Sequence, residues 1–447
     1  MKTPGLSISV AGIRGWYPDV LTPLCAYEYA LAFAAWCPEK HIFVGRDTRA
    51  SGEVMRRIVT AGLLAAGKDV FDLGICPTPL VEFGIERGPA SAGVMVTASH
   101  NPLPYNGIKF LSSKGTFLNE REGRAFFARY DRKEFAVARE PGTWRTDDRL
   151  LERFYAAIRT AVGTDMKRRH FTVVVDACNG VGALSAGEFL RTLGCRVIVI
   201  NDRPLGRFSR NPEPLPEHLG ALCRTVKKEG ADIGFAQDPD GDRLAVVSEQ
   251  GVPIGEEKTL VFAAEAVLRR HRGPVVANLS TTSLLDVVAK RFRVPVRRTK
   301  VGEVHVVEGM KRARAVIGGE GNGGVIWPDV HYGRDSYVGM ALILSYLLER
   351  RTTVSKLADE YPPYRMLKMK YSCGPKEYAV LEREARRRFR GGRSDERDGL
   401  KILTGDGWIH IRRSGTEPVV RVIVEGTTPE KAQAFAKEIG NVIETSQ

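Results

Sequence analysis

A strand–helix–strand pattern that recurs three times is the feature of this sequence that most limits its fold. In each copy an apolar run leads through a polar or Gly-containing turn into an amphipathic helix, and a second apolar run follows. The copies cover residues 41–73, 171–200 and 274–297. Two strands joined through a helix form a βαβ unit. We therefore predict three α/β domains of similar topology.

The chain beyond residue 362 follows a different pattern, in which strands succeed one another without intervening helices. The expected elements are a charged helix over 376–390, strands over 399–403, 407–412 and 419–425, and a final helix over 429–445. Runs of strands with helices set apart from them are typical of an α+β domain. The Pro-containing segment 360–364 would link this smaller domain to the preceding one.

The length of the chain agrees with several domains, because 447 residues exceed what one hydrophobic core usually holds. The predicted domains cover residues 1–145, 146–250, 251–362 and 363–447. Hydrophobic residues make up 43% of the chain, but no apolar run is long enough to cross a bilayer. We therefore expect no membrane partner.

The cysteines point to a reducing compartment. Seven of them are scattered along the chain, and no two form a C-x-x-C pair. This pattern argues against both a disulfide framework and a zinc site. No apolar segment of the kind found in signal peptides follows Lys2. We therefore expect a cytoplasmic protein.

The formal net charge of +14 admits two interpretations. One is a surface for nucleic acid, and the other is a basic bias that includes a pocket for anionic small molecules. The densest basic run, at 386–393, falls at a helix end and carries no zinc-finger spacing or RNP-type aromatic signature. We favour a solvated helix end for this run and expect no nucleic-acid partner.

Ser99 is the candidate nucleophile. In the segment GVMVTASHNP (93–102), an apolar strand runs into a turn of small and polar residues, which would leave Ser99 exposed at the end of the strand. A serine hydroxyl needs a base or a metal to act as a nucleophile. Lys109 is close enough in sequence to help hold a phosphate there. From these residues alone, an ordinary turn with Ser99 as a hydrogen-bonding residue is an equal alternative.

Three aspartates suggest a metal site. Asp238, Asp240 and Asp242 alternate along the segment QDPDGDR, which stands between two apolar strands. Carboxylates this close repel one another unless a cation binds them, and a hard divalent cation such as Mg²⁺ meets this need. A solvated acidic turn is the alternative, but it leaves Arg243 at the end of the segment unexplained.

Two further segments suit a sugar phosphate. In GGEGNGG (318–324) the glycines let the backbone approach a ligand, while Glu320 and Asn322 present an acceptor and an amide for sugar hydroxyls. In RRSGTEP (412–418) an arginine, two hydroxyls and backbone amides freed by a glycine could form a phosphate cradle. A flexible glycine turn and a β-turn with solvated arginines are the respective alternatives.

Together, and in this order, the four segments resemble the α-D-phosphohexomutase superfamily, with Gly12-Ile13-Arg14-Gly15 as a further match near the start. The resemblance extends over essentially the whole chain. It implies three similar α/β domains with mixed sheets and a C-terminal α+β domain like the TATA-binding protein, arranged around a central cleft. It also implies an enzyme that moves a phosphoryl group between O6 and O1 of a hexose, through a phosphoserine and a bisphosphorylated sugar.

The resemblance assigns roles by position. Ser99 matches the phosphoserine, and with Asp238, Asp240 and Asp242 it would hold Mg²⁺. The matched catalytic residues beside it are Arg14, His100 and Lys109, with Lys109 as a candidate general acid/base. The matched substrate-binding residues are Glu320, Asn322, Arg243, Arg412, Ser414, Gly415, Thr416 and Arg421. The implied partners are a hexose or hexosamine phosphate and its bisphosphate, bound by a monomer or a homodimer.

The sugar loop departs from a common family pattern, G-E-x-S-G-H, because Asn322 replaces the Ser and Gly324 replaces the His. The loop and the segment 327–335 are similar to a branch usually assigned phosphoglucosamine mutase activity, with phosphomannomutase and phosphoglucomutase as close alternatives. We hypothesise that His331 partly substitutes for the missing His. A non-catalytic sugar-phosphate-binding protein is a further alternative, but every residue type that the chemistry requires is present.

Overall fold

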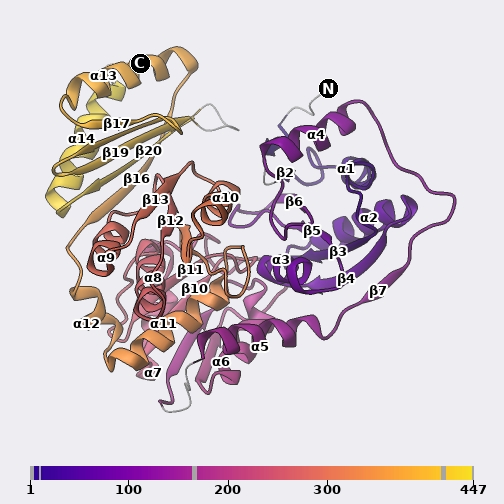
Figure 1. Cartoon of the computed structure of the whole chain (residues 1–447), viewed down its shortest axis with the longest axis horizontal. Coiled ribbons are helices and arrows are strands. Elements are labelled where there is room, and N and C mark those ends of the chain that lie inside the picture. Colours follow the sequence, from indigo (N-terminus) through magenta and orange to yellow (C-terminus); the bar gives the residue numbers. More distant parts are fainter. Residues whose placement is uncertain (1–4, 10–11, 164–168, 414–418, 445–447) are drawn as a thin grey trace.

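The chain folds into four domains, numbered I to IV, each built on one sheet. The computed structural model describes residues 5–9, 12–163, 169–413 and 419–444. Figure 1 shows domain I on the right, domain IV at the upper left, and domains II and III between and below them. The predicted combination of three α/β domains and a C-terminal α+β domain is confirmed.

Domains I, II and III repeat one order of four strands. In domain I, β3 (His41–Arg46) lies between the parallel strands β4 (Asp69–Ile75) and β5 (Ala92–Val96), and β6 (Tyr105–Leu111) runs antiparallel beside β5. The corresponding strands are β8 (Thr172–Asp176), β9 (Arg196–Ile200), β10 (Ile233–Gln237) and β11 (Leu244–Ser248) in domain II, and β12 (Val275–Asn278), β13 (Val296–Thr299), β14 (Ile317–Glu320) and β15 (Gly324–Ile326) in domain III. The expectation of three similar mixed sheets is confirmed.

The three predicted strand–helix–strand repeats supply the first two strands of each sheet. The helices within them are α2 (Gly52–Ala65), α6 (Gly182–Thr192) and α9 (Leu284–Phe292). Domain I extends its sheet with β1 (Ser7–Ser9) and β2 (Gly12–Trp16) beyond β6, and with β7 (Trp144–Thr146) beside β4. These additional strands make domain I the widest sheet of the described chain.

The turn between the third and fourth strands carries the candidate motif in each of these domains. Ser99 lies between β5 and β6, the segment 238–243 between β10 and β11, and Asn322 between β14 and β15. The third strand is parallel to the first, so its turn lies at the carboxyl edge of the sheet, where α/β proteins bind their ligands. Each of the three motifs therefore lies at the same place in its own domain, in the turn that follows the third strand.

One hydrophobic core runs through domains I, II and III. Phe83 of α3 (Thr78–Arg87) packs on Phe154 of α5 (Leu150–Val162), with ring centroids 5.3 Å apart. Phe154 contacts Tyr337 of α11 (Ser336–Arg350), which contacts Phe189 of α6 at 5.5 Å. A packed interior of this kind resists deformation. The shared core therefore holds the three turns in a fixed relation to one another.

Further helices complete these domains. They are α1 (Pro23–Trp36), α4 (Glu120–Asp131), α7 (Gly220–Glu229), α8 (Glu257–Arg270), α10 (Glu303–Ala313) and α12 (Val354–Asp359), with a 3-10 turn over Pro216–His218. Within the described ranges, no helix has both the length and the apolar character that crossing a membrane would require.

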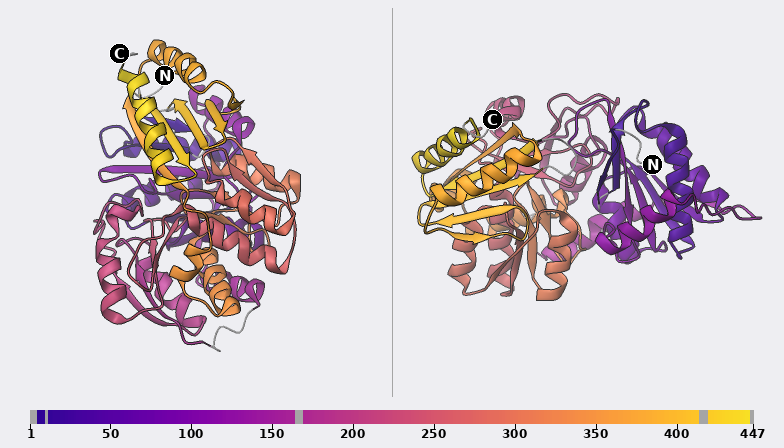
Figure 2. Two further views of the ribbon diagram at one scale, coloured as in Figure 1. Left: turned by 90° about the vertical axis from the view of Figure 1, so that its left-hand side faces the viewer. Right: turned by 90° about the horizontal axis from the view of Figure 1, so that it is seen from above.

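Domain IV is an antiparallel sheet packed against two helices (Figure 2). Its strands follow the order β16 (Arg365–Ser372), β20 (Val419–Gly426), β19 (Gly407–Arg413), β18 (Leu400–Thr404) and β17 (Arg393–Asp395). The helices α13 (Pro375–Arg388) and α14 (Pro429–Glu444) bury Leu381 and Ile439 against the sheet. The expected helices and three of the strands are confirmed, whereas the sequence analysis did not identify β16 and β17.

The densest basic run forms the end of α13 and the turn after it, as expected. Arg386 pairs with Glu396 at 2.6 Å, and Arg387 pairs with Glu384 at 2.7 Å. Neighbouring carboxylates therefore compensate part of its charge.

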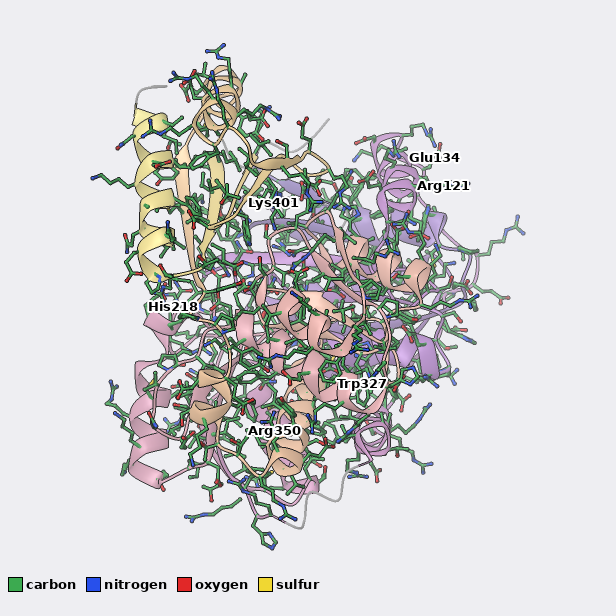
Figure 3. All side chains as sticks on the ribbon, turned by 60° about the vertical axis from the view of Figure 1, so that its left-hand side comes forward. Arg121, Glu134, His218, Trp327, Arg350 and Lys401 are labelled. Atoms are coloured by element: carbon green, nitrogen blue, oxygen red, sulfur yellow. The ribbon has the colours of Figure 1, made fainter. Side chains whose placement is uncertain are left out.

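Lys401 is a buried lysine at the junction of domains III and IV (Figure 3). Its Nζ donates to the Leu279 carbonyl at 2.5 Å. Close by, His410 Nδ1 and Ser280 Oγ form a hydrogen bond of 2.9 Å between the same two domains. Burial, together with the nearby charge of Arg298, lowers the pKa of Lys401 to about 7.

This pKa predicts a pH dependence of stability. Between about pH 7 and 10 the unfolded chain binds a proton that folded Lys401 has released, so the free energy of unfolding should rise with pH, by at most about 1.4 kcal/mol per unit. Lys401→Met should lack this contribution when thermal unfolding of both proteins is followed from pH 7 to 9. Equal slopes would show that Lys401 stays charged, held by the face of Trp408 at 3.8 Å.

Candidate active site

Ser99 occupies a strained turn that other residues cover. Its φ of 50° is left-handed, which is uncommon for a residue with a side chain. Its N–H donates to Thr97 Oγ1 at 2.9 Å, and the N–H of Asn101 donates to the Ala98 carbonyl at 3.1 Å. Ser99 is only 1% exposed, so the expectation of an exposed serine was wrong. The aspartate-containing segment of domain II contacts the turn, because Ser99 Oγ donates to Asp238 Oδ2 at 3.1 Å.

A buried ion pair supports this turn from below. Arg49 donates from Nη2 to the carbonyls of Ser99 at 2.7 Å and Asn101 at 2.6 Å. Its Nε donates to Asp47 Oδ2 at 3.0 Å, and the same oxygen accepts from Thr97 Oγ1 at 2.7 Å. The sequence analysis missed this pair. The available signal was the charged segment that directly follows the apolar strand β3 at the carboxyl edge of the sheet.

Arg49→Met should lower the free energy of unfolding by about 3–5 kcal/mol, because it leaves the buried carboxylate of Asp47 without its cation. Denaturant unfolding measures this change. The matched control is Arg57→Met on α2, where the arginine is largely exposed and pairs with Glu53 at 2.6 Å. That variant should lose less than about 1 kcal/mol. Similar losses in both variants would contradict a supporting role for Arg49.

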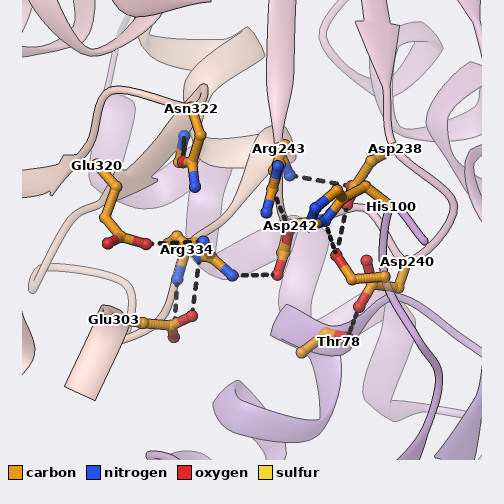
Figure 4. A network of polar contacts seen from close by, with 12 residues as sticks. Thr78, His100, Asp238, Asp240, Asp242, Arg243, Glu303, Glu320, Asn322 and Arg334 are labelled. Carbon is orange, nitrogen blue, oxygen red and sulfur yellow. Dashed lines mark hydrogen bonds and ion pairs between the residues drawn. The ribbon is translucent and has the colours of Figure 1, made fainter. Parts of the chain in front are cut away.

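The three aspartates form a compact buried cluster. Each offers a carboxylate oxygen within 4.8 Å of the others. Asp238 accepts from Ser99 Oγ at 3.1 Å through Oδ2, and its Oδ1 accepts from the N–H groups of Asp242 and Arg243, both at 3.1 Å. Turns from two domains thus bring the candidate nucleophile and the candidate metal ligands into direct contact. Figure 4 shows the three aspartates beside His100.

Two cations approach the cluster from one side. Lys109 Nζ donates to Asp240 Oδ2 at 2.7 Å, and Arg334 Nη2 donates to Asp242 Oδ2 at 2.6 Å. The remaining oxygens, Asp240 Oδ1 and Asp242 Oδ1, are buried and have no hydrogen-bond partner among the described residues. Buried carboxylate oxygens in this state are costly unless a cation binds them. The donor set therefore fits a hard divalent cation.

The charges in the cluster shift one another's pKa values. Burial, with Asp242 and Asp240 alongside, raises the pKa of Asp238 well above its usual value. Burial also opposes ionisation of Asp240, but the Lys109 ammonium and the hydrogen bonds from Asp238, Lys109 and Thr78 together outweigh it and lower the pKa of that carboxyl. For Lys109, burial disfavours the charged form, but Asp240 and Asp242 outweigh it and raise its pKa. Lys109 is therefore an ammonium at neutral pH.

Three more predicted residues lie around Ser99. His100 Nδ1 is 3.4 Å from Ser99 Oγ, and burial with the nearby charges of Arg243 and Arg14 lowers the pKa of His100 well below its usual value. Arg14 Nη1 donates to Asn101 Oδ1 at 3.3 Å. Arg243 Nε lies 3.8 Å from Asp242 Oδ1. Cationic groups thus surround the serine and the aspartates.

The sugar loop of domain III joins the same site. Glu320 is buried, and its Oε2 accepts from Arg334 Nη1 at 2.8 Å. Asn322 is half-buried, and its Oδ1 accepts from the Gly324 N–H at 3.2 Å. The Leu244 N–H, at the end of the turn that carries the three aspartates, donates to the Gly323 carbonyl at 3.0 Å. The turns of domains II and III are therefore hydrogen-bonded to each other.

Comparison with known proteins decides the family. Four family models, described as "Phosphoglucomutase/phosphomannomutase" alpha/beta/alpha domains I, II and III and C-terminal domain, match residues 6–137, 152–251, 256–364 and 374–442 in that order. The chain belongs to the phosphoglucomutase/phosphomannomutase family. The predicted membership of the α-D-phosphohexomutase superfamily is confirmed, and the protein is a phosphohexomutase.

Named relatives and a solved structure agree with this assignment. The chain is 38% identical to "Phosphoglucomutase/phosphomannomutase" of Thermococcus kodakarensis over 95% of each chain. It is 35% identical to "Probable phosphoglucosamine mutase" of Methanopyrus kandleri over 98% of each. The crystal structure of a phosphoglucomutase/phosphomannomutase family protein from Burkholderia thailandensis shares 27% identity and a TM-score of 0.85 over 98% of both chains.

The hypothesis that His331 of this phosphohexomutase replaces the missing family histidine stays a prediction. His331 is 1% exposed, and its Nε2 forms a hydrogen bond of 3.0 Å with Asp335 Oδ2. Its ring packs edge-on against Phe83 and Phe154 of the shared core.

The predicted phosphate loop of the mutase lies mostly outside the described residues, including Ser414, Gly415 and Thr416. Its flanking residues are described. Arg412 on β19 and Arg421 on β20 are direct cross-strand partners. Arg412 Nε pairs with Asp398 Oδ2 at 2.9 Å, and Arg421 is exposed.

Proposed function

We propose that this phosphohexomutase interconverts glucosamine 6-phosphate and glucosamine 1-phosphate through a phosphate carried on Ser99. The hydrogen bond of 3.1 Å from Ser99 Oγ to Asp238 Oδ2 is the observation that carries the proposal. It sets a serine hydroxyl at the edge of a carboxylate cluster that fits a divalent cation. This is the arrangement that phosphoryl transfer to and from a serine requires.

The reaction consists of two opposite transfers. In the first, O1 of the sugar attacks the phosphorus on Ser99 and the O1 hydroxyl loses its proton, while the bond from phosphorus to Oγ breaks and Oγ takes up a proton. The product is a sugar with phosphate on both O1 and O6. After the sugar turns over, Ser99 Oγ loses its proton and attacks the O6 phosphate, while the bond from phosphorus to O6 breaks and O6 takes up a proton. The serine phosphate is regenerated, and glucosamine 1-phosphate departs.

We assign Asp238, Asp240 and Asp242, together with an oxygen of the group on Ser99, to a Mg²⁺ ion. The oxygens without hydrogen-bond partners on Asp240 and Asp242 support this assignment within the described part of the chain. When bound, Mg²⁺ offsets the negative charge of the transferring phosphoryl group.

The surrounding side chains supply charge and proton transfer. Lys109, an ammonium beside Asp240, suits a general acid toward Ser99 Oγ better than a base. His100, 3.4 Å from Ser99 Oγ, is placed to exchange the proton of the sugar hydroxyl. Arg14 and Arg243 add positive charge where the phosphoryl group develops negative charge.

Domain IV is proposed to hold the phosphate that does not react. Arg412 and Arg421 stand opposite each other on β19 and β20, at the base of the turn that contains Ser414, Gly415 and Thr416. Guanidinium groups and backbone amides bind phosphate dianions well. A binding site in another domain would keep the bisphosphorylated sugar attached while it exchanges ends.

Glu320 and Asn322 are proposed to bind the sugar hydroxyls, and glucosamine is the preferred sugar. The preference for an amino sugar rests on the similarity of the loop to the branch usually assigned phosphoglucosamine mutase activity. The two carboxylates nearby already have cationic partners, since Glu320 pairs with Arg334 at 2.8 Å and Glu257 pairs with Lys368 at 3.0 Å. The Methanopyrus relative carries the phosphoglucosamine mutase name. Glucose and mannose phosphates are the second candidate, favoured by the name of the Thermococcus relative at 38% identity.

Coupled assays with glucosamine, glucose and mannose phosphates, each primed with its bisphosphate, test the proposal. We expect kcat/KM on glucosamine phosphate to exceed the other two by at least about tenfold. A higher kcat/KM on glucose or mannose would reassign the sugar and leave the mutase reaction intact. Failure of the primed protein on all three sugars would contradict the reaction itself.

A further inference from the structure

Any side chain at position 324 would occupy the same space as the side chain of Arg334. A Cβ on Gly324 would lie 2.3 Å from Arg334 Cδ and 2.8 Å from its Cγ. These are middle atoms of a side chain whose guanidinium is held at its far end, so they cannot swing aside. The backbone of Gly324 lies outside the left-handed region, unlike that of Gly323 with its φ of 87°. Position 324 therefore requires a glycine because a larger residue would clash with Arg334, and not because the backbone adopts a conformation that only glycine favours.

Arg334 joins three buried carboxylates from two domains (Figure 4). Its Nη2 donates to Asp242 Oδ2 at 2.6 Å, in the metal-binding turn of domain II. Its Nη1 donates to Glu320 Oε2 at 2.8 Å, at the start of the sugar loop in domain III. Its Nε donates to Glu303 Oε2 at 2.9 Å, at the start of α10. One planar guanidinium thus links both loops.

These bonds decide which carboxylate oxygens remain open. Arg334 donates to Asp242 Oδ2 and leaves Oδ1 without a hydrogen bond among the described residues, with Arg243 Nε 3.8 Å away. Glu320 Oε1 accepts from Asn278 Nδ2 at 2.7 Å and from the Gly302 N–H at 2.8 Å. With Arg334 on its other oxygen, the Glu320 carboxylate is held at both ends. A fixed guanidinium fork imposes such orientation in a way that a lysine does not.

We propose that Arg334 is a positioning residue that couples the metal-binding turn to the sugar loop, and that Gly324 is retained to make room for it. Arg334 acts through Asp242 and Glu320, without contact to the sugar. The loop's departure from the G-E-x-S-G-H pattern follows, because a side chain at 324 and Arg334 cannot coexist. Only the kinetic readouts below rest on the proposed function.

The first experiment separates positioning from a general structural role. Arg334→Gln removes one positive charge beside Asp242, so Mn²⁺ titrated alone should bind about 3- to 10-fold more tightly. Turnover should change in the opposite direction, with kcat/KM about 100-fold lower, because Glu320 in the sugar loop loses its orientation. Asp242 should stay in place, because it keeps its ion pairs with Lys109 at 3.5 Å and Arg243 at 3.8 Å. Arg334→Lys should leave the Mn²⁺ affinity within about twofold of wild type and recover part of kcat/KM.

Metal binding and turnover that both weaken in Arg334→Gln would overturn the proposal, because a collapsed site loses both together. The Mn²⁺ titration needs no sugar. It therefore tests Arg334 even if none of the three sugar phosphates is turned over, which separates failure of this proposal from failure of the proposed reaction.

The second experiment is a double-mutant cycle between the two positions. Gly324→Ala should lower kcat/KM about tenfold or more in the wild-type background and lower the Tm, because its Cβ displaces Arg334. In an Arg334→Ala background, which lacks the clashing Cγ and Cδ, the same substitution should cost less than about twofold. The Tm comparison does not depend on activity.

Gly323→Ala is the matched control for this cycle. Its φ of 87° is left-handed, and its Cβ would lie 2.3 Å from the Leu244 carbonyl oxygen, so it should be equally harmful in both backgrounds. If Gly324→Ala lowered kcat/KM and the Tm equally in both backgrounds, as expected for Gly323→Ala, the steric clash between a side chain at 324 and Arg334 would be disproved.

Discussion

Replacing Ser99 by alanine should abolish turnover on every sugar phosphate, with kcat lower by about four orders of magnitude or more. Alanine has no oxygen to carry the phosphate, so neither transfer can begin. The turn itself should survive, because Arg49 and Thr97 hold it through backbone groups of residue 99, which the variant keeps. Coupled assays measure kcat, and mass spectrometry of the peptide that contains residue 99 follows the phosphate.

Ser112→Ala is the matched control for this loss. Ser112 lies in the same domain, and its hydroxyl is buried without a hydrogen-bond partner in the described part of the chain. Removing that oxygen should leave kcat within about twofold of wild type. Ser99→Ala that retained more than about 1% of the wild-type kcat would rule out a phosphoserine intermediate.

The architecture was predictable because its signals are local. The first two strands of each α/β domain are apolar runs separated by an amphipathic helix, and these runs coincide with β3, β8 and β12 and their partners. The edge strand β16 carries a short signal that the sequence analysis missed, because Leu367, Met369 and Tyr371 alternate with two lysines and pack on the core of domain IV. The exposed strand β17 has only three residues and carries no pattern.

The residues that hold the turns of the site in place could not be predicted from the sequence, because their contacts form where separate domains meet. Arg49 and Arg334 are charged residues in polar segments, and nothing nearby in the sequence marks them as buried. They become buried only when turns from three sheets converge. The same convergence covers Ser99 and, through the shared aromatic core, encloses His331. Single-sequence patterns describe one sheet at a time and carry no information on such contacts.

Replacing one of the aspartates proposed to bind Mg²⁺ should have the second large effect. Asp240→Asn should weaken Mn²⁺ binding at least about tenfold and lower kcat/KM by about 100-fold or more, because one of three clustered charges is lost. Asparagine keeps the shape of the side chain, and its oxygen can still accept from Thr78 and Lys109. Isothermal titration with Mn²⁺ and the coupled assay measure the two changes.

Asp232→Asn is the control in the same domain. Asp232 is partly exposed and accepts from Arg169 at 3.0 Å and from the Thr172 N–H at 2.8 Å, so metal binding should not change. Unchanged Mn²⁺ affinity in Asp240→Asn would remove the triad as the metal site. Loss of a negative charge at Asp240 should loosen the metal, whereas loss of the positive charge at Arg334 should tighten it. Local collapse of the site would lower the Mn²⁺ affinity in both variants. Affinities that change in opposite directions would therefore show that charge controls metal binding.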